Sequence, residues 1–411
     1  MSKPEIRLKG FNGEWIKTPL ARIAKFSKGR GYSKMDLRPN GSPIVLYGRL
    51  YTNYETVIND VDTFVETKDN SVLSKGGEII IPASGETPED IACASVVSKI
   101  GVILGGDLNV LSIDSSSYNK AFTALAISYG TVHKELAKYA QGKTVVHLHN
   151  SDISKVTICY PDNEIEQKSI SDYFKSLDSM IQATTKKIVS LKQMKAASLI
   201  SMFPQAGETK PRVRFKGFEG EWKKKRLNEC LEISNERNFE NKYGKEDVLS
   251  VSDDYGVMNQ IELLGRSYAG KSVSNYGILK NGEIVYTKSP LKSKPFGIVK
   301  LNTGKTGIVS VLYAIYRAKE GTVADYIHYY FDPDWRLNDY LRPLVNKGAK
   351  NTMNISDEMA LTGCVMIPED IREQQRIASF FASLDKQISL QEQRLEKLKQ
   401  IKAACLDKMF V

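Results

Sequence analysis

The sequence predicts an α+β protein made of two copies of one plan, each a mixed α/β domain followed by a long helix. Two observations carry this prediction. Residues 166–203 recur at 373–410 with 17 of 38 positions identical, and residues 4–15 recur at 211–222 with 8 of 12 identical. Both matches have the same offset of 207 residues. The segments between them differ, so each half combines a shared frame with a middle of its own.

The repeated segments 166–203 and 373–410 are predicted to be long helices. Neither contains Pro or Gly, and about 38 residues at 1.5 Å rise make a rod of roughly 60 Å. Their apolar side chains recur at the steps of a coiled-coil seam. The seam residues are Ile170, Phe174, Leu177, Ile181, Ile188 and Leu191 in the first segment, and Ile377, Phe381, Leu384, Ile388, Leu395 and Leu398 in the second.

Two arrangements would cover these apolar stripes. In one, each helix is buried in a separate core. In the other, the two stripes cover each other, which we favour because helices of this length usually belong to coiled coils.

Length and composition describe an ordinary globular protein. A chain of 411 residues suits two or three domains, and its 41% apolar and 26% charged residues are typical of soluble proteins. The first ten residues lack the apolar core of a signal peptide, and no stretch approaches 18 uncharged apolar residues. We therefore expect a cytoplasmic protein.

Cysteine spacing and net charge narrow the function classes. The five cysteines are scattered without any Cys-x-x-Cys pair, which argues against a zinc ribbon and against a disulfide framework. The net charge of +10 permits a polyanionic partner such as nucleic acid. By itself this charge is weak evidence, because many basic proteins bind no nucleic acid.

The first half opens with the shared lead at 4–15 and continues through a divergent middle at 26–160. Apolar runs at 42–48 and 77–82 predict strands, and residues 118–139 predict a helical patch. A glycine-containing polar loop at 141–150 and Pro161 precede the long helix. Residues 203–210 end that helix and form a linker. We divide this half into a domain at 1–160 and a central long helix at 161–205.

The second half follows the same plan. Its middle at 234–368 contains predicted strands at 246–252, 282–286 and 307–315 and a predicted helix at 323–331. A second glycine-containing polar loop at 346–354 and Pro368 precede the last helix. The predicted boundaries are 206–367 for the domain and 368–411 for the C-terminal long helix.

Motifs of nucleotide-binding and methyl-transfer enzymes are incomplete. Residues 142–144 and 304–306 resemble the end of a P-loop, but its earlier glycine is replaced by Ala137 and Val299. We interpret both as turns. Residues 332–335 are a poor match to the Asp-Pro-Pro-aromatic motif of adenine methyltransferases, and no glycine-rich cofactor loop accompanies them.

The spacing of the acidic and histidine residues argues against a nuclease site and against a metal site. Asp62, Glu66 and Lys68 lie too close together for a strand-borne carboxylate pair, and the second half has nothing equivalent. His147 and His149 lack a third ligand nearby. The sequence therefore predicts neither a catalytic constellation nor a metal site.

Three repeated motifs together resemble the specificity subunit of type I restriction-modification enzymes. They are the Trp-x-x-x-x-Leu starts, the Pro-x-x-x-x-Glu-Gln helix entries and the Leu-Asp pairs within the helices. The residues concerned are Trp15, Leu20, Pro161, Glu166, Gln167, Leu177 and Asp178, and then Trp222, Leu227, Pro368, Glu373, Gln374, Leu384 and Asp385. The resemblance covers the whole chain.

The resemblance implies a non-catalytic subunit that reads double-stranded DNA through two target recognition domains separated by two antiparallel coiled-coil helices. It implies assembly with two modification subunits and, for cleavage, two restriction subunits. S-adenosylmethionine, ATP and Mg would act on those partners, not on this chain. Two unlike middles imply a bipartite, asymmetric target.

Base reading in such a subunit needs polar side chains on loops that enter the major groove. The candidates of the first domain are Tyr47, Arg49, Tyr51, Tyr54, Ser84, Glu86, Lys143, Thr144 and His147. Those of the second domain are Ser252, Asp253, Lys288, Ser289, Lys292, Lys294, Lys350 and Asn351. The alternative for each is a solvated surface residue.

Two other function classes are compatible with parts of this pattern. One is a scaffolding protein whose rod joins two adaptor domains without binding DNA. The other is a fragment of a fused restriction-methylation enzyme, against which the missing cofactor motifs and the complete repeat argue.

Overall fold

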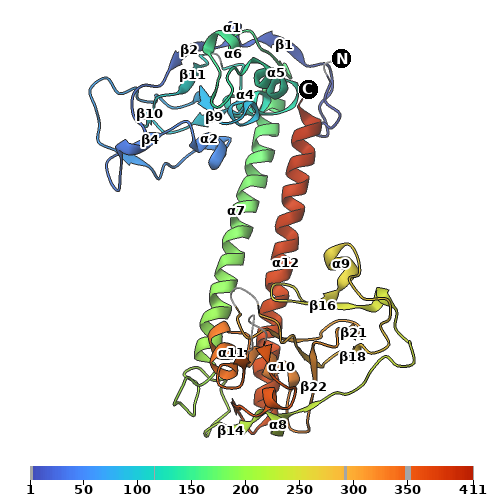
Figure 1. The fold of residues 1–411 in the computed structure, drawn as a ribbon. Coiled ribbons are helices and arrows are strands. Elements are labelled where there is room, and N and C mark those ends of the chain that lie inside the picture. The colour runs from blue at the N-terminus through green and yellow to red at the C-terminus, as the bar shows by residue number, and fades with distance from the viewer. Residues whose placement is uncertain (1–2, 115, 291–293, 348–352, 411) are drawn as a thin grey trace. The chain divides into compact units, whose positions relative to one another are not determined.

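The computed structural model describes residues 3–114, 116–290, 294–347 and 353–410, and the chain forms two compact units. Unit 1 contains residues 1–185 and 393–411, and unit 2 contains residues 186–392. The long helices α7 (Glu164–Ser201) and α12 (Ile371–Met409) each contribute to both units (Figure 1). Their bounds lie within two residues of the repeated segments 166–203 and 373–410. No helix in the described parts is long and apolar enough to cross a membrane.

Unit 1 combines short strands with short helices. The strands are β1 (Ile16–Pro19), β2 (Lys25–Lys28), β3 (Leu37–Arg38), β4 (Ser42–Val45), β5 (Val57–Ile58), β6 (Phe64–Val65), β7 (Glu78–Pro82), β8 (Ser84–Gly85), β9 (Ser95–Val97), β10 (Ile103–Leu104), β11 (Leu108–Ser112), β12 (Val146–His147) and β13 (Thr157–Tyr160). The helices are α1 (Leu20–Ile23), α2 (Arg49–Thr52), α3 (Pro88–Ile91), α4 (Lys120–Ser128), α5 (Gly130–Tyr139) and α6 (Asn150–Ile153), with a 3-10 turn at Lys34–Asp36.

The main sheet of unit 1 has the strand order β2-β11-β7-β9-β5. All its pairs are antiparallel except β5 with β9, and Ile80 of β7 lies opposite Val110 of β11. Every residue of β7 is buried, because its continuous apolar run packs on both faces of the sheet. The smaller sheet β10-β4-β6-β3 lies over a core of its own around Ile44, Val65 and Ile103.

The predicted helical patch at 118–139 is two helices, because the chain breaks between α4 and α5. Gly130 has a φ of +68°, and a Cβ on it would lie 2.4 Å from the backbone oxygen of Phe410. Only glycine allows the end of α12 to approach this closely. The break therefore leaves room for the end of α12, and glycine is required there.

Unit 2 also combines short strands with short helices, but its sheets have a different strand order. Its strands are β14 (Lys223–Arg226), β15 (Leu231–Ile233), β16 (Leu249–Ser252), β17 (Gly256–Asn259), β18 (Gly277–Leu279), β19 (Ile284–Tyr286), β20 (Val299–Leu301), β21 (Gly307–Val309), β22 (Ala314–Ala318), β23 (Asn346–Lys347), β24 (Met353–Asn354) and β25 (Cys364–Ile367). Its helices are α8 (Leu227–Cys230), α9 (Gln260–Leu264), α10 (Ala324–Tyr330) and α11 (Asp334–Leu341), with 3-10 turns at Lys245–Asp247 and Met359–Leu361.

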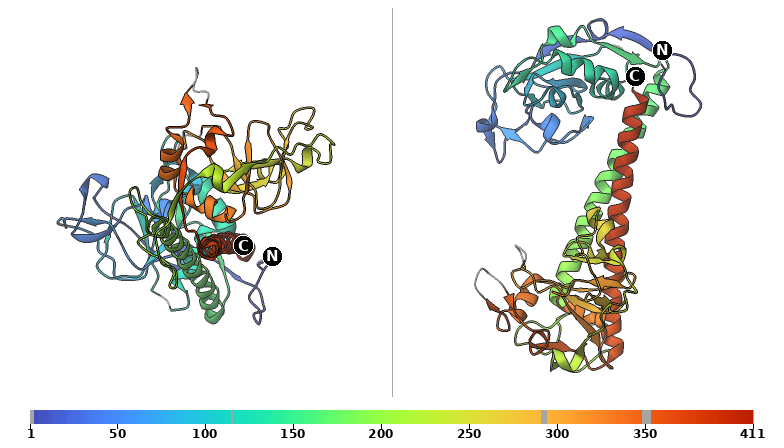
Figure 2. Two further views of the ribbon diagram at one scale, coloured as in Figure 1. Left: turned by 90° about the horizontal axis from the view of Figure 1, so that it is seen from below. Right: turned by 45° about the vertical axis from the view of Figure 1, so that its right-hand side comes forward.

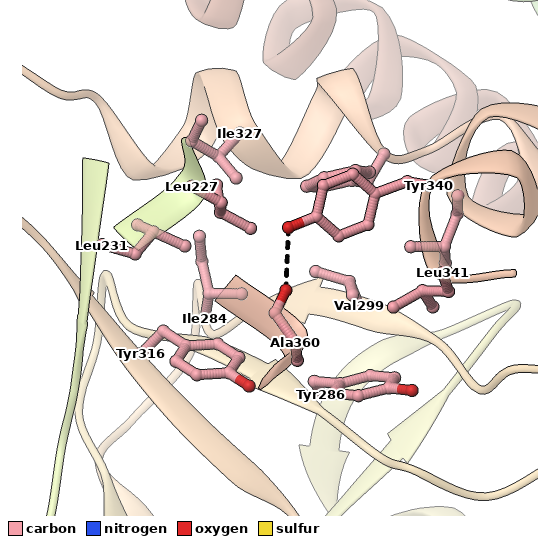
Figure 3. A pocket seen from close by; sticks show the side chains of 12 residues that line it. Leu227, Leu231, Ile284, Tyr286, Val299, Tyr316, Ile327, Tyr340, Leu341 and Ala360 are labelled. Carbon is pink, nitrogen blue, oxygen red and sulfur yellow. Dashed lines mark hydrogen bonds between the residues drawn. The ribbon is translucent and has the colours of Figure 1, made fainter. Parts of the chain in front are cut away.

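The antiparallel sheet β15-β22-β19-β20 forms the centre of unit 2. The predicted strand at 307–315 is two strands, β21 and β22, because a turn closed by the Tyr313 N–H and the Ser310 carbonyl interrupts it. Helix α11 was not predicted. Beneath it lies a small apolar pocket bounded by Ile284, Tyr286, Tyr316 and Tyr340, where the Tyr340 hydroxyl donates to the Ala360 carbonyl at 2.8 Å (Figure 3). Its apolar lining marks it as part of the core.

The hydrogen bonds that hold the start of each long helix are the same in both halves. Arg7 donates twice to Glu166 at 2.7 Å, and Arg214 donates twice to Glu373 at 2.7 and 2.8 Å. Both carboxylates are almost fully buried, which explains why each helix entry needs an arginine from its own lead. The Gln167 and Gln374 amides donate to the carbonyls of Pro161 and Pro368, each at 2.9 Å. The repeated Pro, Glu and Gln residues therefore anchor the start of each long helix.

Each unit also closes around the same ring cluster. In unit 1, Phe410 packs against Phe174 and Phe122, and Trp15 meets Phe122 edge-on. In unit 2, Phe203 packs against Phe381 and Tyr326, and Trp222 meets Tyr326 edge-on. The end of each long helix thus completes the core of the unit in which the other long helix begins.

The two long helices run antiparallel within each unit. In unit 1, Asp178 pairs with Lys402 and the Tyr173 hydroxyl lies 3.4 Å from Cys405, so positions rise on α7 as they fall on α12. In unit 2, Lys192 pairs with Glu392 and Lys195 with Asp385. The right view of Figure 2 shows the end of α12, in red, beside the start of α7. Within each unit, α7 and α12 therefore run side by side in opposite directions. The apolar stripes contact each other only in part, because Ile170 and Phe174 also pack in the core of unit 1 with Phe122.

Candidate nucleic-acid interface

A tight loop between α5 and β12 carries three of the predicted DNA contacts of unit 1. Backbone hydrogen bonds of 3.0 and 2.8 Å join Gln141 to His147 and close the loop. Gly142 has a φ of +140°, and a Cβ there would lie 1.9 Å from the Val145 oxygen, so the turn requires glycine. Lys143, Thr144 and His147 are exposed on this turn.

Strand β12 pairs with β8, which brings more of the candidates to the same place. His147 lies opposite Ser84, and Glu86 follows exposed at the end of β8. Ser84 itself is buried, so its hydroxyl is not exposed on this surface.

Helix α2 and the residues just before it add two tyrosines near β8. The rings of Tyr47 and Tyr51 lie 6.4 Å apart, and a Cβ on Gly85 would lie 3.7 Å from the Tyr51 ring. Burial raises the pKa of Tyr51, and the neighbouring Tyr47 and Glu86 raise it further, so its hydroxyl remains a neutral donor. We call the exposed parts of α2, Glu86 and the 141–147 loop the loop surface of unit 1.

Arg49 and Tyr54 are engaged inside the fold. Arg49 pairs with Glu55 at 2.8 Å and with Asp62 at 2.5 Å, and its side chain is 14% exposed. The Tyr54 hydroxyl donates to Ser128 at 3.2 Å, and burial raises the pKa of Tyr54 to about 12. Through these bonds, both side chains stabilise the segment that carries Tyr47 and Tyr51.

The candidates of unit 2 include a buried ion cluster at the β16–β17 turn. Ser252, half-buried, ends β16, and the Asp253 carboxylate that follows pairs with Lys294 at 2.6 Å and Lys300 at 3.2 Å. Lys294 also pairs with Asp334 at 2.9 Å and has a side chain only 5% exposed. Lys294 therefore faces Asp253 and Asp334 and not the solvent, whereas the Asp253 side chain is still 30% exposed.

The same cluster continues to the long helices. Lys195 of α7 pairs with Asp332 at 3.0 Å and with Asp385 of α12 at 2.8 Å. Burial alone would lower the pKa of Lys195, but the two carboxylates hold it above its ordinary value. The sequence analysis did not predict this cluster. The repeat does indicate its lysine and one aspartate, because Lys195 and Asp385 recur as Lys402 and Asp178.

Lys288 and Ser289 follow β19 in a constrained turn. Lys288 has a φ of +50°, unusual for a residue with a side chain, and its ammonium pairs with Asp357 at 2.6 Å. A Cβ on Gly297 would lie 3.2 Å from the Lys288 nitrogen, so the two turns are packed closely. Ser289 is half-buried beside it. The remaining candidates Lys292, Lys350 and Asn351 lie outside the described residues.

His328, which the sequence did not single out, lies beside Asp332. Its Nδ1 is buried and has no hydrogen-bond partner among the described residues. Burial lowers the pKa of His328 to about 4, so the ring is neutral at pH 7.

Most of the predicted packing residues are buried in the cores of the two units. Ile170, Phe174 and Leu177 are buried in the core of unit 1 and Ile181 is half-buried, while Ile377, Phe381, Leu384 and Ile388 are buried in the core of unit 2. Leu177 shares its core with Leu406 and Met409 of α12.

The model of a known domain family matches both halves. The type I restriction modification DNA specificity domain matches residues 12–193 and 219–400, which together make up most of the chain at the same offset of 207. The chain belongs to this family. It is therefore a specificity subunit of a type I restriction-modification system, a non-catalytic DNA-recognition component, and the predicted fold class and function are confirmed. Nothing favours the scaffolding alternative.

One of three similar solved structures supports the fold with a TM-score above 0.5. The S subunit of a type I restriction-modification system from M. genitalium has a TM-score of 0.60 at 13% identity, with 100% of this chain and 99% of that chain covered. A type I system structure concerned with complex assembly and conformational transition gives 0.49 at 14% identity, covering 96% and 97%. The HsdS subunit from Thermoanaerobacter tengcongensis gives 0.45 at 15%, covering 96% of each chain. None of the curated proteins matches the chain.

Proposed function

We propose that this specificity subunit reads a bipartite, asymmetric double-stranded DNA target, one half with each predicted domain, 1–160 and 206–367. The observation that carries the proposal is the contrast between frame and middle. The frame repeats down to the ion pairs Arg7–Glu166 and Arg214–Glu373, whereas the surfaces between these anchors share neither sequence nor strand order. Two unlike readers on equivalent frames would recognise two unlike half-sites.

The loop surface of unit 1 has the chemistry for reading a major groove. Lys143 would contact guanine or a phosphate, and Thr144 and His147 supply further hydrogen-bonding groups on the same exposed turn. Tyr47 and Tyr51 offer hydroxyls beside it. Arg49 and Tyr54 would position this surface through their internal bonds.

In unit 2, Lys288, Ser289 and Ser252 would contact DNA together with Lys292, Lys350 and Asn351. Asp253 and Lys294 would hold the β16–β17 turn in place. A duplex can be read twice on one face when two modules are about one helical turn, some 34 Å, apart or a multiple of it.

Catalysis would belong to the partners. We propose assembly with two modification subunits, which methylate adenine with S-adenosylmethionine, and with two restriction subunits that use ATP and Mg to translocate and cleave DNA. The chain would work in the cytoplasm with the DNA that those partners modify.

Methylome sequencing tests this function directly. A host that carries the subunit and its modification partner should show one N6-methyladenine motif with two specified halves and an unspecified spacer. Duplex binding by the assembled methyltransferase should weaken steeply with salt, because DNA association releases counterions. A methylome without any such motif would contradict the proposal.

A further inference from the structure

A second cavity of unit 2 lies outside the regions proposed to read DNA. Its volume is about 420 Å³, within the range of ligand pockets, and it is open to solvent. It is bounded by residues 204–209 after α7, by β14 and β25, and by α11. Trp335 at its rim is 42% exposed, and Tyr340 and Val365 add apolar surface.

A buried arginine without a carboxylate partner lines this cavity. Arg336 is 6% exposed, and it donates to the carbonyls of Tyr330 at 3.0 Å and Leu199 at 3.2 Å. Its guanidinium also lies 4.7 Å from the centre of the Trp335 ring. Among the described residues no ion pair involves Arg336, and two of its five N–H groups are used, so three remain. A buried cation with free donors favours an anion.

The other groups around the cavity also leave positive charge uncompensated. Lys224 is exposed on the rim, and the described residues give it no ion-pair partner. The two acidic residues of the lining are already paired, Glu208 with Arg212 at 3.1 Å and Asp339 with Arg342 at 3.0 Å. The indole Nε1 of Trp222 is buried without an acceptor in the described chain.

The arginine belongs to the second half alone. The Nε1 of Trp15, the repeat equivalent of Trp222, lacks a partner as well, so the indole by itself does not distinguish the two units. The residues 207 and 204 positions before Arg336 are Tyr129 and Val132, so the first half has no matching cation. The frame of unit 1 forms without an equivalent arginine, which indicates that Arg336 has a separate role in unit 2.

We infer that this cavity binds an acidic peptide segment of a partner protein, with a carboxylate on Arg336 and Lys224 and an adjacent apolar side chain against Trp335. The volume exceeds that of a lone carboxylate, so the apolar wall needs a second group to cover it. The carboxylate would accept from the free guanidinium N–H groups. This site is independent of DNA reading.

Tryptophan fluorescence of the full chain measures this binding, because two of its three tryptophans line the cavity. The probe is the peptide Ac-Gly-Phe-Glu-Gly-NH2, and its matched control has Gln in place of Glu. We expect a saturable change with the Glu peptide and at least tenfold weaker binding of the Gln peptide. Sodium acetate should bind weakly, because it lacks the apolar group. Equal response to the two peptides, no response to either, or acetate binding as tightly as the peptide would overturn the proposal.

Variants at the rim test the same site without disturbing the core. Lys224→Glu should weaken the Glu peptide at least tenfold, whereas Lys225→Glu, the same charge change one residue along β14 and outside the lining, should stay within twofold. Trp335→Ala should also weaken binding, and its thermal unfolding should match that of the wild type because the ring is half exposed. Equal effects of the two lysine variants would contradict the site.

Discussion

The ammonium of Lys195 lies 2.8 Å from the carboxylate of Asp385, and this pair joins α7 to α12 in unit 2. The repeat places the same pair in unit 1 with the helices exchanged, as Lys402 and Asp178. Among the described residues, only the pair of unit 2 extends further, through Asp332 and Lys300 to Asp253 in the β16–β17 turn. Unit 2 thus adds further ion pairs to the helix contact that both units share.

Lys195→Met should destabilise unit 2. It leaves the carboxylates of Asp332 and Asp385 in a partly buried site without their cation, and loss of one partner of a buried pair costs roughly 3 to 5 kcal/mol. The control is Lys192→Met, which removes an exposed pair with Glu392 three residues earlier and should cost less than about 1 kcal/mol. Chemical unfolding of both variants measures the difference, and equal losses would show that the cluster is energetically inert.

Leu177→Asp should prevent the end of α12 from packing in unit 1. The substitution places a carboxylate among Leu406, Met409 and the Phe174 ring, at a cost of several kcal/mol. Ser179→Asp introduces the same charge on the exposed side of α7 and is the matched control. The yield of assembled methyltransferase is the readout. An assembled Leu177→Asp complex at normal yield, still methylating the same sites, would count against the paired helices.

His328 predicts a specific acid sensitivity. Its pKa is lowered to about 4 in the folded protein from an ordinary value near 6.5, so the unfolded chain takes up the proton first as pH falls. Above about pH 6.5, protonation of His328 should not affect the free energy of unfolding of unit 2. Between pH 6.5 and pH 4 this free energy should fall, by at most about 3 kcal/mol from His328. His328→Gln should remove that part of the pH dependence. A wild-type and variant with parallel stability curves from pH 7 to 4 would contradict it.

Lys143→Ala should weaken DNA binding by the assembled methyltransferase. The loss of one phosphate contact would reduce the salt slope by about 1, and the loss of a guanine contact would relax one position of the motif. Lys138→Ala, an exposed lysine on α5 outside the 141–147 loop, should leave both unchanged. Identical behaviour of the two variants would remove the loop from the proposed interface.

Much of the frame could be predicted because it is repeated. The apolar steps locate both long helices, and Glu166 and Glu373 mark their entries, since each is a buried carboxylate that its own arginine must pair. The close approach of Phe410 to Gly130 could not be predicted, because the two residues are far apart in the sequence. The turn that splits residues 307–315 depends on a local backbone bond that the apolar run conceals.

The candidate contacts were harder, because a lysine or arginine in a polar loop has the same sequence signature whether it is free or paired. Arg49 meets Glu55 and Asp62, and Lys294 meets Asp253 and Asp334, only in the folded chain. Lys143 remains exposed because Gly142 turns its loop away from the core.

Exchange of one middle segment tests the central claim, that the two halves read separate halves of one target. Residues 26–160 would be replaced with the corresponding block of another type I specificity subunit, and N6-methyladenine would be mapped across a host that also carries the modification partner. We predict that one half of the methylated motif changes while the other half stays the same. An active chimera in which both halves change, or in which neither changes, would contradict the account.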